Sequence, residues 1–196
     1  EENGDIRLIQ DDVPNVTTTW DNRYNTEANY NYGINSFERE EGDSRLKDKL
    51  LAYYESAISN DDKSLVVPQQ FCVGARSADD YSTDGSTECQ TKSELMSVGG
   101  MIISEYLEAS LDPTCIYISS KGCTNYNYLA KLSNSFWLIT PNTKNSYEAY
   151  VLYQTIRSSQ CSSIYNIRLV LDINSNVNYT SGTGTEEDPY IISANV

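Results

Sequence analysis

The sequence predicts an α+β fold in which two helices pack on short antiparallel sheets. Apolar residues recur at four-residue steps early in the chain, whereas β-branched and aromatic runs gather after Ser135. Strands and helices do not alternate, and no internal repeat is visible. With 196 residues, of which 39% are hydrophobic, the chain is long enough for one core, and we expect residues 1–196 to form a single domain.

The N-terminal half predicts one strand, a long loop and a helix. Residues 5–10 have the pattern of a strand, and residues 11–33 form a polar, aromatic loop that contains Trp20. Ser44 is a suitable N-cap for a helix over 44–59 that Asn60 ends. Its apolar side chains fall on one face, which predicts packing on a sheet: Leu46, Leu50, Tyr54 and Ile58.

The rest of the chain predicts one more helix among short strands. Residues 65–67 and 70–73 indicate strands around Pro68, residues 75–90 a loop, and residues 94–98 a further strand. A turn at 99–100 then precedes a helix over 101–110, which Pro113 closes. After Ser135, strand signals occur at 136–140, 147–153, 165–173 and 190–192, with a turn at 181–185.

Composition excludes several functions. The chain carries 14 Lys and Arg against 28 Asp and Glu, a net charge of −14, without a basic cluster. We therefore expect neither nucleic acid nor an anionic membrane surface as a partner. The apolar runs are too short to span a bilayer, so we expect no membrane insertion by this segment.

The absence of histidine excludes Ser-His-Asp, Cys-His and His-metal chemistry. A pair of catalytic carboxylates is conceivable, but the acids between Glu38 and Asp43 fit a solvated loop. We expect a protein that is not an enzyme and has no cofactor, apart from the calcium alternative below. The start at Glu1, directly before a strand, is interpreted as the cut end of a longer precursor.

Five cysteines lack the CxxC spacing of zinc or redox sites. Sequential pairing predicts the disulfides Cys72–Cys89 and Cys115–Cys123, each closing a local loop. Cys161 is left unpaired, either because its partner lies in a removed segment or because it is a buried free thiol. Disulfides indicate an extracellular or cell-surface location.

One acidic loop has part of the spacing of a calcium site. Asp80, Ser82 and Asp84 occupy positions one, three and five, a glycine occupies position six, and Glu88 follows. Thr91 stands at position twelve, where such loops have a bidentate Glu. A solvated loop held by Cys72–Cys89 is the preferred interpretation, and calcium binding is the alternative.

Several motifs occur in one order along most of the chain. Residues 5–10 precede Trp20-Asp21, and Ser44-Arg45-Leu46 opens the first helix. Later come Phe136-Trp137-Leu138-Ile139-Thr140-Pro141, then Ile167-Arg168-Leu169, then the run from Ser181 to Tyr190. This order resembles an uncharacterised domain family of Gram-positive surface proteins with WLRSP or WLLTP, GVRP and GDGTxENPY motifs, often found behind prepilin-like N-termini.

The resemblance implies a C-type-lectin-like fold, related in architecture to formylglycine-generating enzymes. It implies that Trp137 lies buried near the centre of the C-terminal sheet and that Arg168 staples loops from a neighbouring strand. The family's proline after the arginine is Leu169 here. Formylglycine-generating enzymes need two reactive cysteines near the C-terminal end of the fold, where Cys161 stands alone.

We expect a displayed binding module for a glycan or protein ligand, because sixteen tyrosines and many asparagines suit hydrogen-bonding and stacking surfaces. Residues 20–32 and 142–165 would present such side chains on one patch. Strand alternation, however, puts Tyr150 on the opposite face from Tyr147 and Tyr153, so that half of these tyrosines and asparagines face the core. The alternative is the globular head of a pilin-like filament subunit, with copies of itself as partners. The candidate ligand-binding residues are Asn142, Asn145, Tyr147, Tyr150, Tyr153 and Tyr165.

Overall fold

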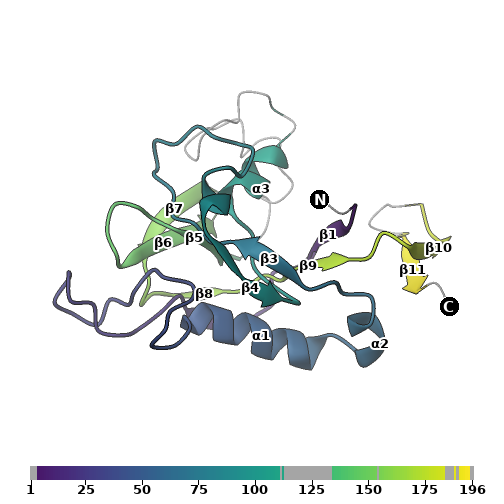
Figure 1. The fold of residues 1–196 in the computed structure, drawn as a ribbon, viewed down its shortest axis with the longest axis horizontal. Helices are drawn as coiled ribbons and strands as arrows, with labels where there is room; N and C mark the ends of the chain where they lie inside the picture. The colour runs from purple at the N-terminus through teal and green to yellow at the C-terminus, as the bar shows by residue number, and fades with distance from the viewer. Residues whose placement is uncertain are drawn as a thin grey trace.

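The computed structural model describes residues 4–110, 112, 134–153, 155–183, 188 and 190–194. It shows the mixed α+β class that the sequence predicts, built from short sheets and few helices (Figure 1). The largest sheet has the order β2-β8-β5-β6-β7, and only the β5–β8 pair is parallel. Its strands are β2 (Thr17–Thr19), β5 (Phe136–Pro141), β6 (Glu148–Tyr153), β7 (Thr155–Gln160) and β8 (Ile164–Asn166).

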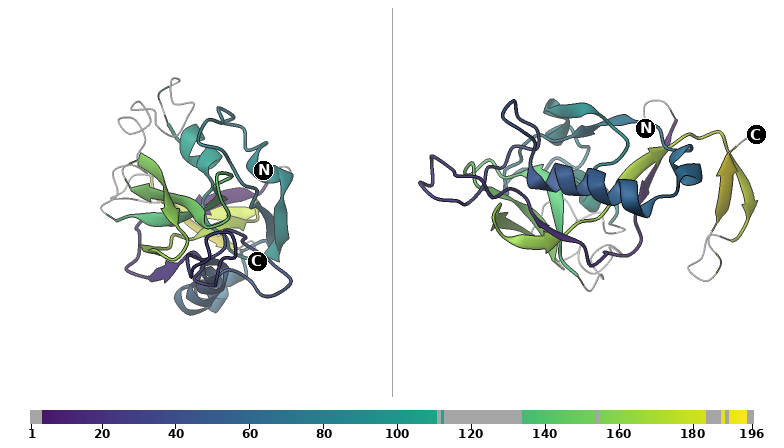
Figure 2. Two further views of the ribbon diagram at one scale, coloured as in Figure 1. Left: turned by 90° about the vertical axis from the view of Figure 1, so that its left-hand side faces the viewer. Right: turned by 90° about the horizontal axis from the view of Figure 1, so that it is seen from below.

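Among the described residues, three antiparallel pairs complete the sheets. β1 (Ile6–Ile9) pairs with β9 (Val170–Ile173), and β3 (Gln69–Cys72) pairs with β4 (Lys92–Met96). β10 (Val177–Ser181) pairs with β11 (Ile191–Ala194) in a hairpin that extends from the body near the C-terminus (Figures 1 and 2).

α1 (Arg45–Ala57) forms where the four-residue apolar pattern predicts it. The Ser44 side chain accepts a hydrogen bond from the Lys47 amide, which satisfies a free N–H of the first turn. Leu46, Leu50 and Tyr54 are buried, so that the helix packs along one side of the body (Figure 2). α2 (Asn60–Lys63) is a single turn capped by Ser59, at the place where the sequence predicts only a break.

The second predicted helix is shorter than expected. α3 (Ile103–Glu108) begins two residues later than the predicted start at Met101, because the Ile139 amide donates to the Met101 carbonyl and ties it to β5. The preceding turn approaches the β3 strand closely: a Cβ added at Gly99 would lie 2.4 Å from the Phe71 ring. Only glycine fits there.

The prediction of one strand over 165–173 is wrong. β8 and β9 belong to different sheets, and residues 167–169 connect them through the interior. The Ile167 amide donates to the Val16 carbonyl, and the Arg168 guanidinium donates to the carbonyls of Gln10 and Asp11. Hydrophobicity alone does not distinguish such a buried crossing from a continuous strand. β2, β7 and β10 are strands that the sequence analysis does not predict.

The buried hydrophobic side chains form one cluster that joins α1, α3 and the sheet around β5. Trp137 lies on this central strand with 1% of its surface exposed, and its indole N–H donates to the Thr18 carbonyl. Trp20 packs nearby and donates to the Leu138 carbonyl at 3.0 Å. The described residues of β10 and β11 contribute nothing to this cluster. In the part of the chain that the structure describes, no helix is long and apolar enough to cross a membrane.

Candidate functional site

Two loops from distant parts of the sequence meet at the end of the molecule away from the β10–β11 hairpin (Figures 1 and 2). The Asn35 side-chain amide donates to the carbonyls of Asn142 and Asn145, at 2.9 and 2.8 Å. The Asn25 amide donates to the Ser146 hydroxyl at 3.0 Å. Loop 22–35 is therefore held against loop 142–147, which connects β5 to β6.

Loop 22–35 is fixed at its base by the buried Asp21 carboxylate. That carboxylate accepts from the Asn22 and Ile34 amides and from Arg23 Nε at 3.0 Å. Gly33 closes the loop with a φ of 84°, and a Cβ there would lie 2.3 Å from the Asp21 carbonyl. These contacts fix the base of the loop, whose tip, residues 26–31, is mostly exposed to solvent.

A groove of about 660 Å³ lies beside the paired loops. Glu27 and residues 35–38, 73–75, 91–92 and 141–146 line it. The volume falls within the usual range for small-ligand sites. The lining combines amide, hydroxyl, carboxylate and ammonium groups, so the groove is suited to a polar ligand.

Three tyrosines of loops 22–35 and 142–147 form what we call the tyrosine cluster: Tyr30, Tyr32 and Tyr147. The ring centroids of Tyr30 and Tyr32 lie 4.8 Å apart, and those of Tyr32 and Tyr147 lie 5.7 Å apart. Tyr30 is 60% exposed, and the other two are partly exposed. Tyr147 directly follows Ser146 of the groove lining in the sequence, but none of the three tyrosines lines the groove itself.

Three of the six predicted ligand-binding residues belong to the groove lining or to the tyrosine cluster. Asn142 and Asn145 line the groove, and Tyr147 belongs to the tyrosine cluster. The two asparagines also shape the loop, because Asn142 Oδ1 accepts from the Lys144 amide and Asn145 Oδ1 accepts from the Tyr147 amide. Asn142 is mostly buried and is better placed to support a ligand site than to reach far into it.

The other three predicted residues do not line the groove. Tyr150 is 1% exposed and donates from its hydroxyl to the Arg76 carbonyl, so its side chain faces the core rather than the surface. Burial raises the pKa of Tyr150 to about 12. Tyr165 packs edge-on against Trp137 at 4.9 Å, and Tyr153 is exposed beneath the Arg157 guanidinium.

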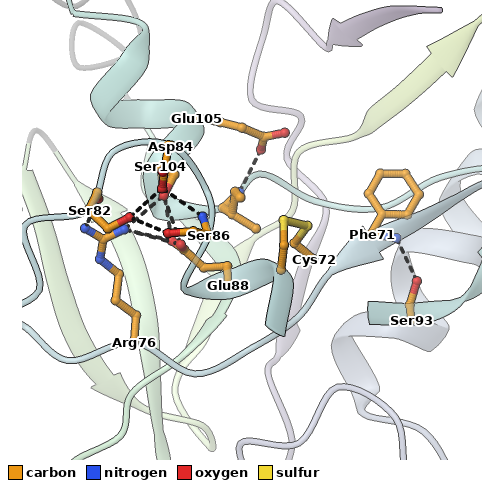
Figure 3. Close-up of a disulfide and its surroundings, with 12 residues drawn as sticks. Phe71, Cys72, Arg76, Ser82, Asp84, Ser86, Glu88, Ser93, Ser104 and Glu105 are labelled. Carbon is orange, nitrogen blue, oxygen red and sulfur yellow. Dashed lines mark hydrogen bonds and ion pairs between the residues drawn. A yellow bond between two sulfur atoms is a disulfide. The ribbon is translucent and has the colours of Figure 1, made fainter. Parts of the chain in front are cut away.

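The predicted calcium ligands Ser82, Asp84 and Glu88 are engaged by other groups of the protein (Figure 3). Glu88 is fully buried and accepts from Arg76 at 3.1 Å and from both the amide and hydroxyl of Ser104. Asp84 instead accepts from the hydroxyl of Ser82, which also lies in the predicted ligand set.

The carboxylates of Asp80 and Asp84 accept hydrogen bonds from other residues of their own loop. Hydrogen bonds from Ser86 and Ser82 hold the pKa of Asp84 well below its usual range. Asp80 accepts from the Thr87 hydroxyl at 2.6 Å. Within the described residues, no group of three or more His, Cys, Asp or Glu side chains could hold a metal ion.

The Cys72–Cys89 disulfide confirms the first predicted pair and closes this loop (Figure 3). Cys115 and Cys123 lie outside the described residues, so their pairing stays a prediction that non-reducing peptide mapping can test. Cys161 is a buried free thiol, which agrees with one of the two alternatives for it. Burial raises the pKa of this thiol well above its usual value.

A buried ammonium group lies next to the groove. Lys47 Nζ contacts carboxylate oxygens of Glu38, Asp43 and Glu94 at 2.7 to 2.8 Å. Burial by itself lowers the pKa of Lys47, but the hydrogen bonds to these three carboxylates outweigh burial and hold the pKa above its usual value. Glu38, which also lines the groove, is therefore engaged by an internal cation.

No protein-family model, curated protein or solved structure matches this chain.

Proposed function

We propose that this chain is a non-enzymatic extracellular binding module that takes a glycan or protein ligand on the groove and the tyrosine cluster. The observation that carries the proposal is the convergence of loops 22–35 and 142–147, which supply both the tyrosine cluster and part of the groove lining. Tyrosine provides rigid contact area with few torsions to immobilise on binding. Such a surface suits sugars and polar protein surfaces alike.

Binding is favoured over catalysis because the acids of the groove are already engaged. Glu27 accepts from the Ser146 hydroxyl at 2.6 Å, and Glu38 is paired with Lys47 at 2.8 Å. A general base must be free to take a proton from a substrate. The chain also has no histidine.

We further propose membership of the Gram-positive surface-domain family and a C-type-lectin-like architecture. The position of Trp137 on the central strand supports this assignment, as do the bonds from Arg168 to the carbonyls of Gln10 and Asp11. The Cys72–Cys89 disulfide supports an oxidising location such as the cell surface.

A glycan and protein array screen tests the proposed function. We expect a ligand that binds the wild-type chain and loses at least about tenfold in affinity with the double variant Tyr30→Ala and Tyr32→Ala, as for central contact residues. Tyr179→Ala is the matched control, because Tyr179 is 61% exposed on the distant β10–β11 hairpin. Equal losses in both variants, or a ligand that neither variant affects, would place the site elsewhere.

One observation favours a second candidate, a filament subunit. The β10–β11 hairpin carries exposed Tyr179, Tyr190 and Ile191, and the Tyr179 and Tyr190 rings meet at 5.4 Å. Such apolar exposure on a projecting hairpin suits contact with another copy. Sedimentation velocity distinguishes the candidates: a subunit self-associates, and Tyr179→Ser with Ile191→Ser abolishes that association, whereas a binding module stays monomeric in both forms.

A further inference from the structure

The Cys72–Cys89 disulfide adjoins one part of the groove lining. Residues 73–75 follow Cys72 directly and line the groove. Two of their amides donate, each at 2.8 Å, to the carbonyls of Glu88 and Thr91, which lie on either side of Cys89. The two ends of the loop that the disulfide closes therefore run together at the point where the chain enters the groove wall.

Arg76 connects this closed loop to loop 142–147, which also lines the groove. The Arg76 carbonyl accepts from the Thr143 amide at 3.2 Å. The Arg76 guanidinium donates to the Glu88 carboxylate at 3.1 Å, and Glu88 directly precedes Cys89 (Figure 3). Because such buried contacts are closely packed, a displacement of the chain at Cys89 is transmitted through Glu88 and Arg76 to the groove.

A thiol from solvent can reach the disulfide. Both of its cysteines are partly exposed and line a second pocket of about 580 Å³. Gly85 lines the same pocket and places no side chain over Cys89, whose sulfur would lie 3.7 Å from a Cβ at this glycine. Lys92 lines both this pocket and the groove, so the two are neighbours. The free thiol of Cys161, by contrast, is fully buried.

We propose that Cys72–Cys89 is a redox-sensitive clamp, which a dithiol reductant opens from the second pocket and which then releases the groove wall. A thiolate of the reductant attacks one sulfur of the disulfide, forms a mixed disulfide and expels the other cysteine as a thiolate. The second thiol of the reductant attacks the mixed disulfide and expels the remaining cysteine. The reductant leaves as a disulfide after giving two electrons, and its two thiol protons pass to Cys72 and Cys89.

The consequence of opening the clamp is local. The bond closes a loop with a sequence separation of 17, and a disulfide acts mainly by restricting the segment that it closes. The buried Arg76–Glu88 pair is not affected by reduction, so the loop stays attached at that point while residues 73–75 gain freedom. This device goes beyond the proposed function, because it concerns the groove wall and not the identity of a ligand.

The test treats the folded chain with dithiothreitol, alkylates the free thiols, and locates the labelled cysteines by peptide mapping. Amide hydrogen exchange is followed in residues 141–147 and in α1. We expect label on Cys72 and Cys89 but not on Cys161. Exchange in 141–147 should accelerate at least about tenfold more than exchange in α1, since a closed loop of this kind restricts local opening. Reoxidation should restore the original rates.

The double variant Cys115→Ser and Cys123→Ser is the matched control, because it keeps Cys72 and Cys89 and lacks the other predicted pair. It should respond to dithiothreitol as the wild-type chain does, and a lost response would assign the effect to the other pair and overturn the clamp. The double variant Cys72→Ser and Cys89→Ser should exchange like the reduced chain and should not respond to dithiothreitol.

Two results with the wild-type chain would also overturn the proposal. Label that reaches Cys72 and Cys89 only together with Cys161 would mean that the disulfide opens only when the chain unfolds. Equal acceleration in 141–147 and α1, or none in either, would mean that reduction lowers overall stability at most and does not act on the groove. No ligand is used in these measurements, so their outcome and that of the array screen are independent.

Discussion

Glu88 and Arg76 form an ion pair in which both side chains are fully buried. Glu88→Gln keeps the shape of the side chain but leaves the Arg76 charge without its buried partner. Removing one member of such a pair costs about 3 to 5 kcal/mol. We expect a loss of this size in the free energy of unfolding, measured by urea denaturation followed by tryptophan fluorescence.

An exposed pair provides the control for this substitution. Glu41 accepts from Arg39 at 2.9 Å, but its side chain is largely in solvent. Glu41→Gln should leave the free energy of unfolding nearly unchanged, since exposed pairs contribute little. Similar effects of the two substitutions would mean that burial does not determine the strength of the Arg76–Glu88 contact.

Tyr150 predicts a pH dependence. Burial raises its pKa to about 12, whereas an unfolded tyrosine titrates near about pH 10. The unfolded state therefore loses its proton first, and the stability contributed by Tyr150 is complete below about pH 10 and lost as the pH rises towards 12. Tyr150→Phe should lose less stability across this window than wild type, as measured by urea unfolding at each pH. Parallel curves for the two proteins would contradict the prediction.

At the scale of single elements, α1 depends on its N-cap. Ser44 is buried, and its hydroxyl accepts from the Lys47 amide at 3.1 Å. Ser44→Ala leaves this amide without a partner and should cost about 1 kcal/mol in unfolding free energy. Ser56→Ala, near the exposed end of the same helix, should be close to neutral because alanine is a better helix former. Urea titrations of the two variants test this, and an equal effect would contradict the capping role.

The sequence predicts α1 well because a periodic apolar face and a capping residue are local signals. β2 has no such signal: Thr17–Thr19 is a short polar run that becomes a strand by pairing with Ile164–Asn166. The division between β8 and β9 is also non-local, since Val16 and Gln10 bind the connecting residues. These features depend on partners more than 140 residues away, as Thr18 and Tyr165 illustrate, and a local pattern does not contain them.

The candidate site likewise combines residues that local signals predict with residues that only the fold brings together. Asn142, Asn145 and Tyr147 could be predicted because they follow a recognisable strand and have side chains suited to binding. Tyr150 has the same chemistry, but its place in the middle of β6 buries it. Lys92 reaches the groove only because the fold places the start of β4 beside the β5–β6 loop, and no sequence signal marks it.

At the scale of the whole molecule, the two surfaces with candidate functions lie at opposite ends (Figure 1). Loops 22–35 and 142–147 supply the tyrosine cluster and part of the groove lining. Figure 1 shows the β10–β11 hairpin at the other end, near the C-terminus. The core between them includes α1, α3 and β5. Ligand binding and self-association can therefore be altered separately, which is why the control residue Tyr179 is informative.

The β10–β11 hairpin should be dispensable for the stability of the body. Its described residues add nothing to the core cluster, and its Ile192 and Ser193 line a shallow pocket together with residues of α2. Two-stranded hairpins on their own are only marginally stable. A chain that ends at Asn176 keeps the bond from the Asn174 amide to the Leu65 carbonyl and the β1–β9 pair.

We expect this shortened chain to unfold within about 1 kcal/mol of the full chain in urea, as for changes outside a core. Its near-ultraviolet circular dichroism should be almost unchanged, because Trp20 and Trp137 lie in the retained core. The shortened chain should also bind the same arrayed ligand with the same affinity, since the groove lies at the other end. A loss of several kcal/mol, or of the tryptophan signal, would show that the hairpin is an integral part of the fold.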